Sequence, residues 1–110
     1  MSIENLDVTL GVTYFIEMDI SRFPDLLTPD YTLVGQIRES VSNTLLASFN
    51  IIKSPDKNRI YAILDSTSTT NLVINKQKIY NFDIVAKFNT KVFKLVYGNV
   101  NFQNLVTSLV

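Results

Sequence analysis

The sequence contains no cysteine and no histidine, and these absences exclude several kinds of chemistry. Without cysteine, no disulfide can staple the fold, and no thiolate can act as a nucleophile or a metal ligand. Without histidine, the commonest general base of enzymes is missing, and a Ser-His-Asp or Cys-His arrangement is impossible. The only glycines, Gly11, Gly35 and Gly98, are too far apart for a phosphate-binding loop. We therefore expect a protein that is not an enzyme and that uses no catalytic residue, metal or cofactor.

The chain also lacks net charge and long apolar runs. Ten basic and ten acidic residues give a formal net charge of zero, so there is no long-range attraction to nucleic acid or to an anionic membrane. No basic segment follows Met1, and no apolar run is long enough for a signal peptide or a membrane span. We expect a protein made in the cytoplasm, with neither nucleic acid nor membrane among its partners.

What the chain does have is a strongly apolar composition with regular alternation. Its 110 residues, 46% hydrophobic with seven Phe and five Tyr, predict a single folded domain over residues 1–110. From residue 8 to residue 20 every even position is apolar, which predicts a strand with one buried face. Gly11 lies inside this segment and predicts a bend that divides it between two sheets. The apolar positions are Val8, Leu10, Val12, Tyr14, Ile16, Met18 and Ile20.

Further strands are expected over residues 31–38, 45–51, 59–64, 78–88 and 92–102. Polar turns at 39–43, 54–58 and 89–90 separate them, residues 21–30 form a loop, and residues 65–70 form one helical turn capped by Asp65 or Ser66. Six or seven short strands without a long helix predict an all-β sandwich or barrel, with the two-sheet sandwich favoured. No linker divides the chain.

The charged residues favour a solvated surface over a site. Glu17 and Asp19 share the polar face of the first strand, but two exposed carboxylates on a strand do not make the shaped, oxygen-rich loop that calcium needs. The same interpretation applies to Asp25 and Asp30. Acidic residues dominate the first half of the chain and lysines the second, which leaves head-to-tail charge complementarity between subunits as an alternative.

Most aromatic residues alternate with polar ones and are expected in the core rather than on a platform for bases or sugars. Phe15, Tyr61 and Phe93 fall on the opposite parity from the core face of their strands, so they are candidates for a protein interface. Residues 1–10, with Val8 and Leu10, are expected to form a docking arm that adds a strand to a neighbouring sheet. The complete set of candidate interface residues is Val8, Leu10, Phe15, Tyr61, Phe93 and Leu109.

One segment, LTPDYTLVGQIRES at residues 27–40, resembles a sequence segment of the small immunoglobulin-like domains in virion structural proteins of tailed bacteriophages, especially cyanophages. These domains occur in tail, baseplate and fibre-attachment proteins. The resemblance continues in order over nearly the whole chain from Thr9 onward. INKQ at residues 74–77 departs from the family's LPAG, which leaves the geometry of that turn open but not the order of the strands. The other matching segments are LASF at 46–49, NRIYAIL at 58–64, YNFDI at 80–84, LVYGNVNF at 95–102 and LVT at 105–107.

The resemblance implies an immunoglobulin-like antiparallel β-sandwich of about seven strands and a role in building a virion. It implies multiple copies docked on other virion proteins, either on the major capsid protein as a decoration or cement subunit or on tail and baseplate proteins as an adaptor. It carries no catalytic residues. Two other functions stay open: a carbohydrate- or receptor-binding sandwich, and, less favoured, a barrel that binds single-stranded nucleic acid.

Overall fold

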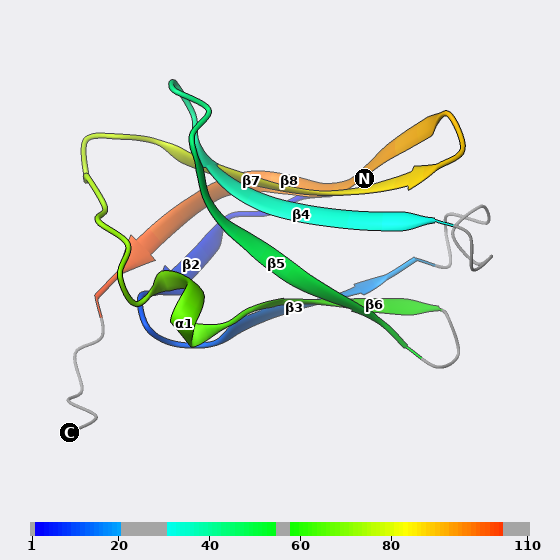
Figure 1. Ribbon diagram of the computed structural model, residues 1–110, viewed down its shortest axis with the longest axis horizontal. Helices are drawn as coiled ribbons and strands as arrows, with labels where there is room; N and C mark the ends of the chain where they lie inside the picture. Colours follow the sequence, from blue (N-terminus) through cyan, green and yellow to red (C-terminus); the bar gives the residue numbers. More distant parts are fainter. Residues whose placement is uncertain (1, 21–30, 55–57, 105–110) are drawn as a thin grey trace.

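The computed structural model describes residues 2–20, 31–54 and 58–104 of the chain (Figure 1). Within these ranges the chain forms strands and a single helical turn, so the prediction of an all-β domain is confirmed. The elements are β1 Ser2–Ile3, β2 Leu6–Thr9, β3 Tyr14–Asp19, β4 Thr32–Glu39, β5 Leu45–Lys53, β6 Arg59–Leu64, α1 Ser66–Thr69, β7 Tyr80–Phe88 and β8 Lys91–Gln103.

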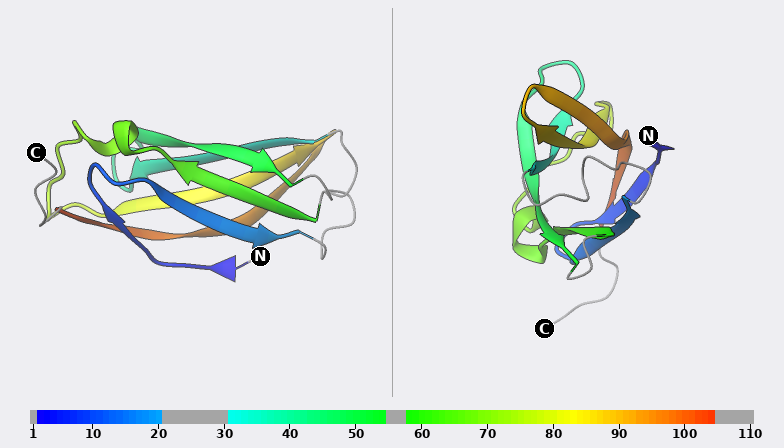
Figure 2. Two further views of the ribbon diagram at one scale, coloured as in Figure 1. Left: turned by 90° about the horizontal axis from the view of Figure 1, so that it is seen from below. Right: turned by 90° about the vertical axis from the view of Figure 1, so that its right-hand side faces the viewer.

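The strands form two layers that are joined through β5. The hydrogen-bonded order is β1-β8-β7-β4-β5-β6-β3, and β2 also pairs with β8. The first half of β5 pairs with β4, and its second half pairs with β6, so the same strand passes from one layer to the other. The end-on view in Figure 2 shows the layers facing each other. This is the all-β sandwich expected from the sequence, although β1 and β2 pair with β8 in parallel and not in the antiparallel manner that was expected throughout.

The apolar segment at the beginning of the chain divides at Gly11, as predicted. β2 pairs with β8 in one layer, whereas β3 pairs with β6 in the other. Gly11 has a φ of 78°, a left-handed conformation that favours glycine, and its N–H donates to Thr69 Oγ1 at 2.9 Å. Because Thr69 is fully buried in the helical turn, this bond fixes the corner between the layers to the interior of the domain.

The first residues do not leave the domain as an arm. β1 and β2 lie parallel to β8 in the same chain, and the N–H of Glu4 donates to the carbonyl of Tyr97 at 2.9 Å. Leu6 and Val8 are buried in the core. The prediction of a docking arm over residues 1–10 is therefore wrong for residues 2–10, because the edge of the chain's own β8 accepts them.

The core lies between the layers and is built from the alternate residues of each strand. Ile37, Ile60, Leu64 and Ile84 are among its fully buried side chains, and Phe49 and Phe82 meet edge to face with ring centroids 6.3 Å apart. Burial of this apolar area is the main source of stability in a chain without disulfides. The helical turn predicted near residue 66 is also present, although the Asp65 side chain makes no capping hydrogen bond.

Candidate binding surfaces

A one-residue bulge in β8 determines which side chains of that strand face outward. Val85 of β7 is opposite Lys94, but the preceding residue, Ile84, is opposite Val96, so Leu95 is the extra residue. Leu95 and Val96 are both buried, at 4% and 2% exposure. The bulge therefore reverses the alternation of β8 between its two halves, which is how bulges re-aim side chains.

This reversal overturns the prediction for Phe93. In the second half of β8 the even-numbered residues Val96 and Val100 face inward. If that alternation continued to the beginning of the strand, the odd-numbered Phe93 would face outward. The bulge instead places it opposite Ala86 of the inner face, where it is half-buried and packs against the core. Phe93 is thus a core-packing residue, and its assignment to an exposed interface is wrong.

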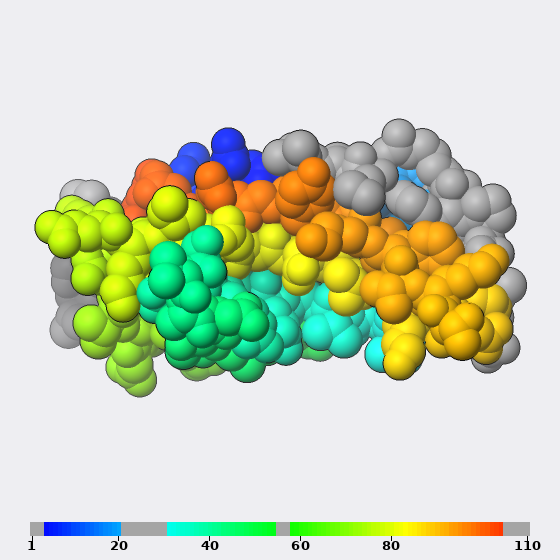
Figure 3. All heavy atoms as spheres, turned by 90° about the horizontal axis from the view of Figure 1, so that it is seen from above, coloured from blue at the N-terminus to red at the C-terminus, as the bar shows by residue number. Residues whose placement is uncertain are grey.

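The outer face of β4, β7 and β8 carries polar side chains in two rows across the strands. Gln36, Asp83 and Tyr97 form one row, because their strands pair in that register. The second row is formed in the same way by Arg38, Asn81 and Asn99. Figure 3 looks onto this face, where atoms of β4, β7 and β8 lie side by side.

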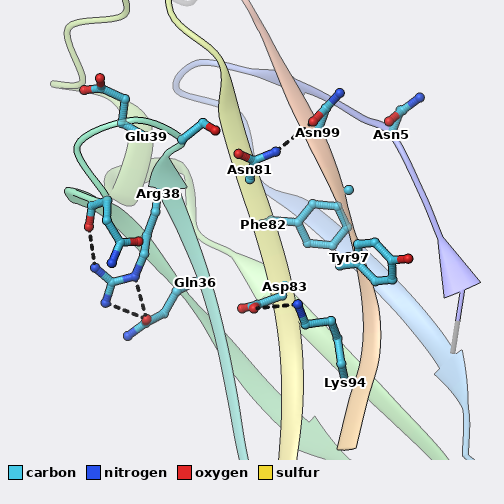
Figure 4. A pocket seen from close by; sticks show the side chains of 13 residues that line it. Asn5, Gln36, Arg38, Glu39, Asn81, Phe82, Asp83, Lys94, Tyr97 and Asn99 are labelled. Atoms are coloured by element: carbon cyan, nitrogen blue, oxygen red, sulfur yellow. Dashed lines mark hydrogen bonds and ion pairs between the residues drawn. The ribbon is translucent and has the colours of Figure 1, made fainter.

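These rows border a concavity of about 430 Å³, hereafter the polar groove. Residues of three strands and of the β1–β2 connection line it, as Figure 4 shows. Its principal lining residues are Asn5, Gln36, Arg38, Asn81, Asp83, Lys94, Tyr97 and Asn99.

Contacts within the polar groove hold several of its side chains in place. Lys94 Nζ lies 3.9 Å from Asp83 Oδ2 and 5.1 Å from the centroid of the Tyr97 ring. On the neighbouring row, Asn81 Nδ2 donates to Asn99 Oδ1 at 2.7 Å. The Asp83 and Lys94 side chains nevertheless remain 43% and 46% exposed. The groove therefore presents amides, a carboxylate, an ammonium group and an aromatic ring to a ligand in partly fixed positions.

Arg38 closes one side of the polar groove. Its Nε and Nη2 donate to Gln36 Oε1 at 3.2 and 2.9 Å, and its Nη1 donates to the carbonyl of Asn43 at 2.8 Å. Asn43 has a φ of 58° in the β4–β5 turn, so the guanidinium ties this turn to the sheet face. This groove was not predicted from the sequence. The one local signal was the run of polar residues on the outer parity of β7.

The outer face of the opposite layer carries a group of apolar side chains among polar ones. Phe15 of β3 is opposite Ile63 of β6, and Tyr61 of β6 is opposite Ile52 of β5, so these four residues lie in two adjacent rows and are hereafter called the apolar face. Asn50 and Glu17 are the polar ends of the same two rows. Phe15 is 63% exposed and Ile52 is 47% exposed. The structure thus brings together two of the residues that the sequence identified as interface candidates, Phe15 and Tyr61. Large exposed apolar side chains that adjoin one another are typical of interaction surfaces.

An ion pair lies beside the apolar face. The Arg59 guanidinium donates a hydrogen bond to the Glu17 carboxylate across β3 and β6, and this bond raises the pKa of the arginine above its usual value. Both side chains are substantially exposed. Glu17 therefore belongs to the polar border of this surface, in agreement with the interpretation of Glu17 as a surface residue.

The remaining candidates fall elsewhere. Val8 is fully buried, which corrects its assignment to an interface, while Leu10 is half-buried just after β2. Leu109, like Asp25 and Asp30, lies outside the described residues. Among the residues that the structure does describe, no group of three or more acidic, histidine or cysteine side chains is placed to hold a metal. In the same ranges no helix is long and apolar enough to cross a membrane.

Comparisons with known proteins give a similarity of fold. No protein-family model and no curated protein matches the chain. Among solved structures, the chain is similar to the inferred receptor-binding domain of the human endogenous retrovirus envelope EnvP(b)1, with a TM-score of 0.52 and 10% sequence identity. The alignment covers 96% of this chain and 93% of that one. At this identity the likeness concerns the architecture alone.

Proposed function

We propose that the chain is a non-enzymatic structural subunit of a tailed-bacteriophage particle, present in multiple copies and docked on other virion proteins through the apolar face. The observation that carries the proposal is the cross-strand cluster of Phe15, Tyr61, Ile63 and Ile52 on the outside of a well-packed domain. An isolated sandwich gains nothing from exposing such a cluster, whereas a partner that covers it removes apolar area from water.

Two further features support this proposal. The resemblance of residues 27–40 and the segments after them to immunoglobulin-like virion proteins supports a role in particle building. The absence of net charge suits docking by apolar contact better than docking by electrostatic attraction. The partner is either the major capsid protein, for a decoration or cement subunit, or a tail or baseplate protein, for an adaptor.

The test is to measure the copy number of this chain in purified virions by mass spectrometry, relative to the major capsid protein. Roughly hundreds of copies would indicate a capsid decoration subunit, and roughly six to a few dozen a tail or baseplate adaptor, since these components follow different closed symmetries. Absence of the chain from intact particles would refute the proposal.

A pair of variants then tests the apolar face itself. Phe15→Asp places a charge in the cluster and should reduce incorporation into particles at least about tenfold, because an unpaired charge would be buried at the interface. Val73→Asp is the matched control, since Val73 is 94% exposed and lies in the connection between α1 and β7. Equal incorporation of the two variants would exclude the apolar face as the docking surface.

A second candidate function is binding of a receptor or carbohydrate through the polar groove. The specific observation is that the amide groups of Asn81 and Asn99 and the carboxylate of Asp83, from the two adjacent rows, line the polar groove together with the Tyr97 ring. Such groups can pair with the hydroxyls of a sugar while the ring packs against its apolar face. The similar fold of the EnvP(b)1 domain, described as an inferred receptor-binding domain, is compatible with this second function.

Binding of the purified domain to a glycan array distinguishes this candidate. Saturable binding that Tyr97→Ala and Asn81→Ala abolish, and that Asn50→Ala on the opposite layer leaves unchanged, would establish the polar groove as a receptor site. Lack of binding to any glycan, combined with a fixed copy number in virions, would favour the structural role.

A further inference from the structure

β3 has one edge that no described strand covers. Among the strands that the structure describes it pairs with β6 alone, and the N–H of Ile20, just after β3, donates to the carbonyl of Asn58 at 2.9 Å. Because successive N–H groups of a strand alternate in direction, the even-numbered residues of β3 bond to β6. The N–H and C=O groups of Phe15 and Glu17 therefore point away from β6, toward the uncovered edge.

A cleft of about 570 Å³ lies along this edge. The inward side chains of β3, Tyr14, Ile16 and Met18, are only half-buried beside it, and Leu95 and Val96 at the β8 bulge line its interior. In a completed sheet the neighbouring strand would cover such side chains. The cleft thus lies beside an uncovered strand edge and has an apolar interior that can receive side chains.

The rim of the cleft is acidic. Glu4, Glu17 and Asp19 line it, and no lysine or arginine of the described residues does. Burial raises the pKa of the Tyr14 phenol, and the charges of Asp7 and Glu4 raise it further. The negative charge near the rim therefore acts on a side chain that lines the cleft. Arg59 pairs with Glu17 from the β6 side and does not line the cleft.

We propose that the open edge of β3 binds an extended segment of a partner protein in which apolar residues alternate with lysine or arginine. The segment adds a strand to β3 through the backbone groups of Phe15 and Glu17. Its apolar side chains enter the cleft beside Ile16 and Met18, and its basic side chains lie on the outer side, next to Glu17 and Asp19. This surface is the edge of β3 rather than the apolar face, and the inference holds whether or not that face docks on a virion.

The charge and the alternation together select this occupant. A second copy of β3 in antiparallel pairing would bring acidic side chains of the two copies close together, which is unfavourable in cross-strand positions. A basic strand meets opposite charges at the same positions. A nucleic acid is excluded as the occupant, because the acidic side chains at the rim repel its phosphates.

A synthetic eight-residue peptide of alternating valine and lysine is the probe, and the same peptide with glutamate in place of lysine is its control. The lysine peptide should bind the whole domain and protect the amides of Phe15 and Glu17 from hydrogen exchange, as measured by NMR. We expect the glutamate peptide to bind at least about tenfold more weakly, and added salt to reduce the difference. Equal affinity for the two peptides, or protection of amides elsewhere only, would overturn the proposal.

Variants at one position separate the backbone contribution from the charge. Glu17→Pro removes an N–H from the open side of β3 and leaves the N–H groups that bond to β6, a placement that proline tolerates on edge strands. Glu17→Thr removes the same charge but retains the N–H. We expect the proline variant to bind the lysine peptide about tenfold more weakly than the threonine variant.

Equal binding by the two variants would exclude strand addition. If Glu17→Pro fails to unfold cooperatively, the amide protection in the unsubstituted protein decides the question by itself. Concentration-dependent dimerisation of the domain alone, with protection of the same two amides, would show that a second copy occupies the edge and would also overturn the proposal.

Discussion

The carbonyl oxygen of Glu4 occupies the place that a Cβ atom at Gly98 would need, so the N-terminal segment runs beside β8 too closely for any side chain at that position. The N–H of Glu4 donates to the carbonyl of the neighbouring Tyr97, which holds the segment at this close approach. The contact lies in the connection between β1 and β2. The two strands pair with β8 in the same register, but the ladder pairing is interrupted between them. Gly98 thus determines how closely the first strands approach the sheet.

Replacing this glycine tests the close approach of the Glu4 backbone to β8. Gly98→Ala should lower the free energy of unfolding by about 2–4 kcal/mol, because a backbone atom rather than a flexible side chain must move. Urea unfolding followed by circular dichroism measures the change, with Asn99→Ala on the exposed side of β8 as the control. A decrease in the free energy of unfolding of less than about 0.5 kcal/mol for Gly98→Ala would mean that the Glu4 backbone moves away from β8 without strain.

Removal of residues 1–9 should unfold the domain. The deletion takes away Val8 and Leu6, which are 0% and 5% exposed, together with the whole parallel pairing to β8. Deleting buried aliphatic side chains costs about 2–5 kcal/mol each, so most of the stability of a domain of this size would be lost. Loss of the cooperative thermal transition is the expected result. A truncated chain that melts cooperatively near the original temperature would restore the idea of a separate arm.

The hydroxyl of Tyr31 provides a stabilising substitution. This oxygen is buried and has no hydrogen-bond partner in the described structure, although Lys53 Nζ lies 3.9 Å from the ring centroid. Tyr31→Phe removes the unsatisfied group and keeps the ring, so we expect the free energy of unfolding to rise by about 1 kcal/mol. A decrease measured by urea unfolding would show that the hydroxyl has a partner in solution.

Alkaline pH should destabilise the domain through Tyr14. Burial, followed by the charges of Asp7 and Glu4, raises the pKa of Tyr14 in the folded state. The unfolded chain therefore loses this proton first, at about pH 10, and stability falls as the pH rises from there through the higher folded pKa. Tyr14→Phe should flatten this decline in urea unfolding between about pH 9 and pH 11. An unchanged slope would assign the decline to other groups.

The alternation of the sequence was sufficient to predict most of the architecture. The even-numbered apolar residues around Gly11 predicted both a strand and its division between layers, because a one-faced strand has period two and glycine permits the corner. The outward positions of Phe15, which is exposed, and of Tyr61, which is half-buried, followed from the same parity. The burial of one face of a strand produces an alternation of apolar and polar residues within that strand. This alternation can therefore be seen in a single sequence.

Features that depend on cross-strand register could not be predicted. The adjacent apolar residues Leu95 and Val96 were the only sign of the bulge, and without it Phe93 was assigned to the wrong face. The polar groove was missed for a related reason. Gln36, Asp83 and Tyr97 become neighbours only when three strands pair in one particular register, and the turns that set this register do not specify it by residue type alone.

The parallel pairing of β1 and β2 with β8 has a mechanical consequence. These strands belong to the two ends of the described chain and run in the same direction, so a force that pulls the ends apart along the strands loads their hydrogen bonds in shear. All six residue pairs then resist together, whereas pulling across a hairpin would open its pairs one at a time. A single-molecule experiment should record a higher unfolding force between residues 2 and 103 than between the two strands of the β7–β8 hairpin. We therefore expect this small domain to resist tension between residues 2 and 103 more strongly than the peeling apart of its β7–β8 hairpin.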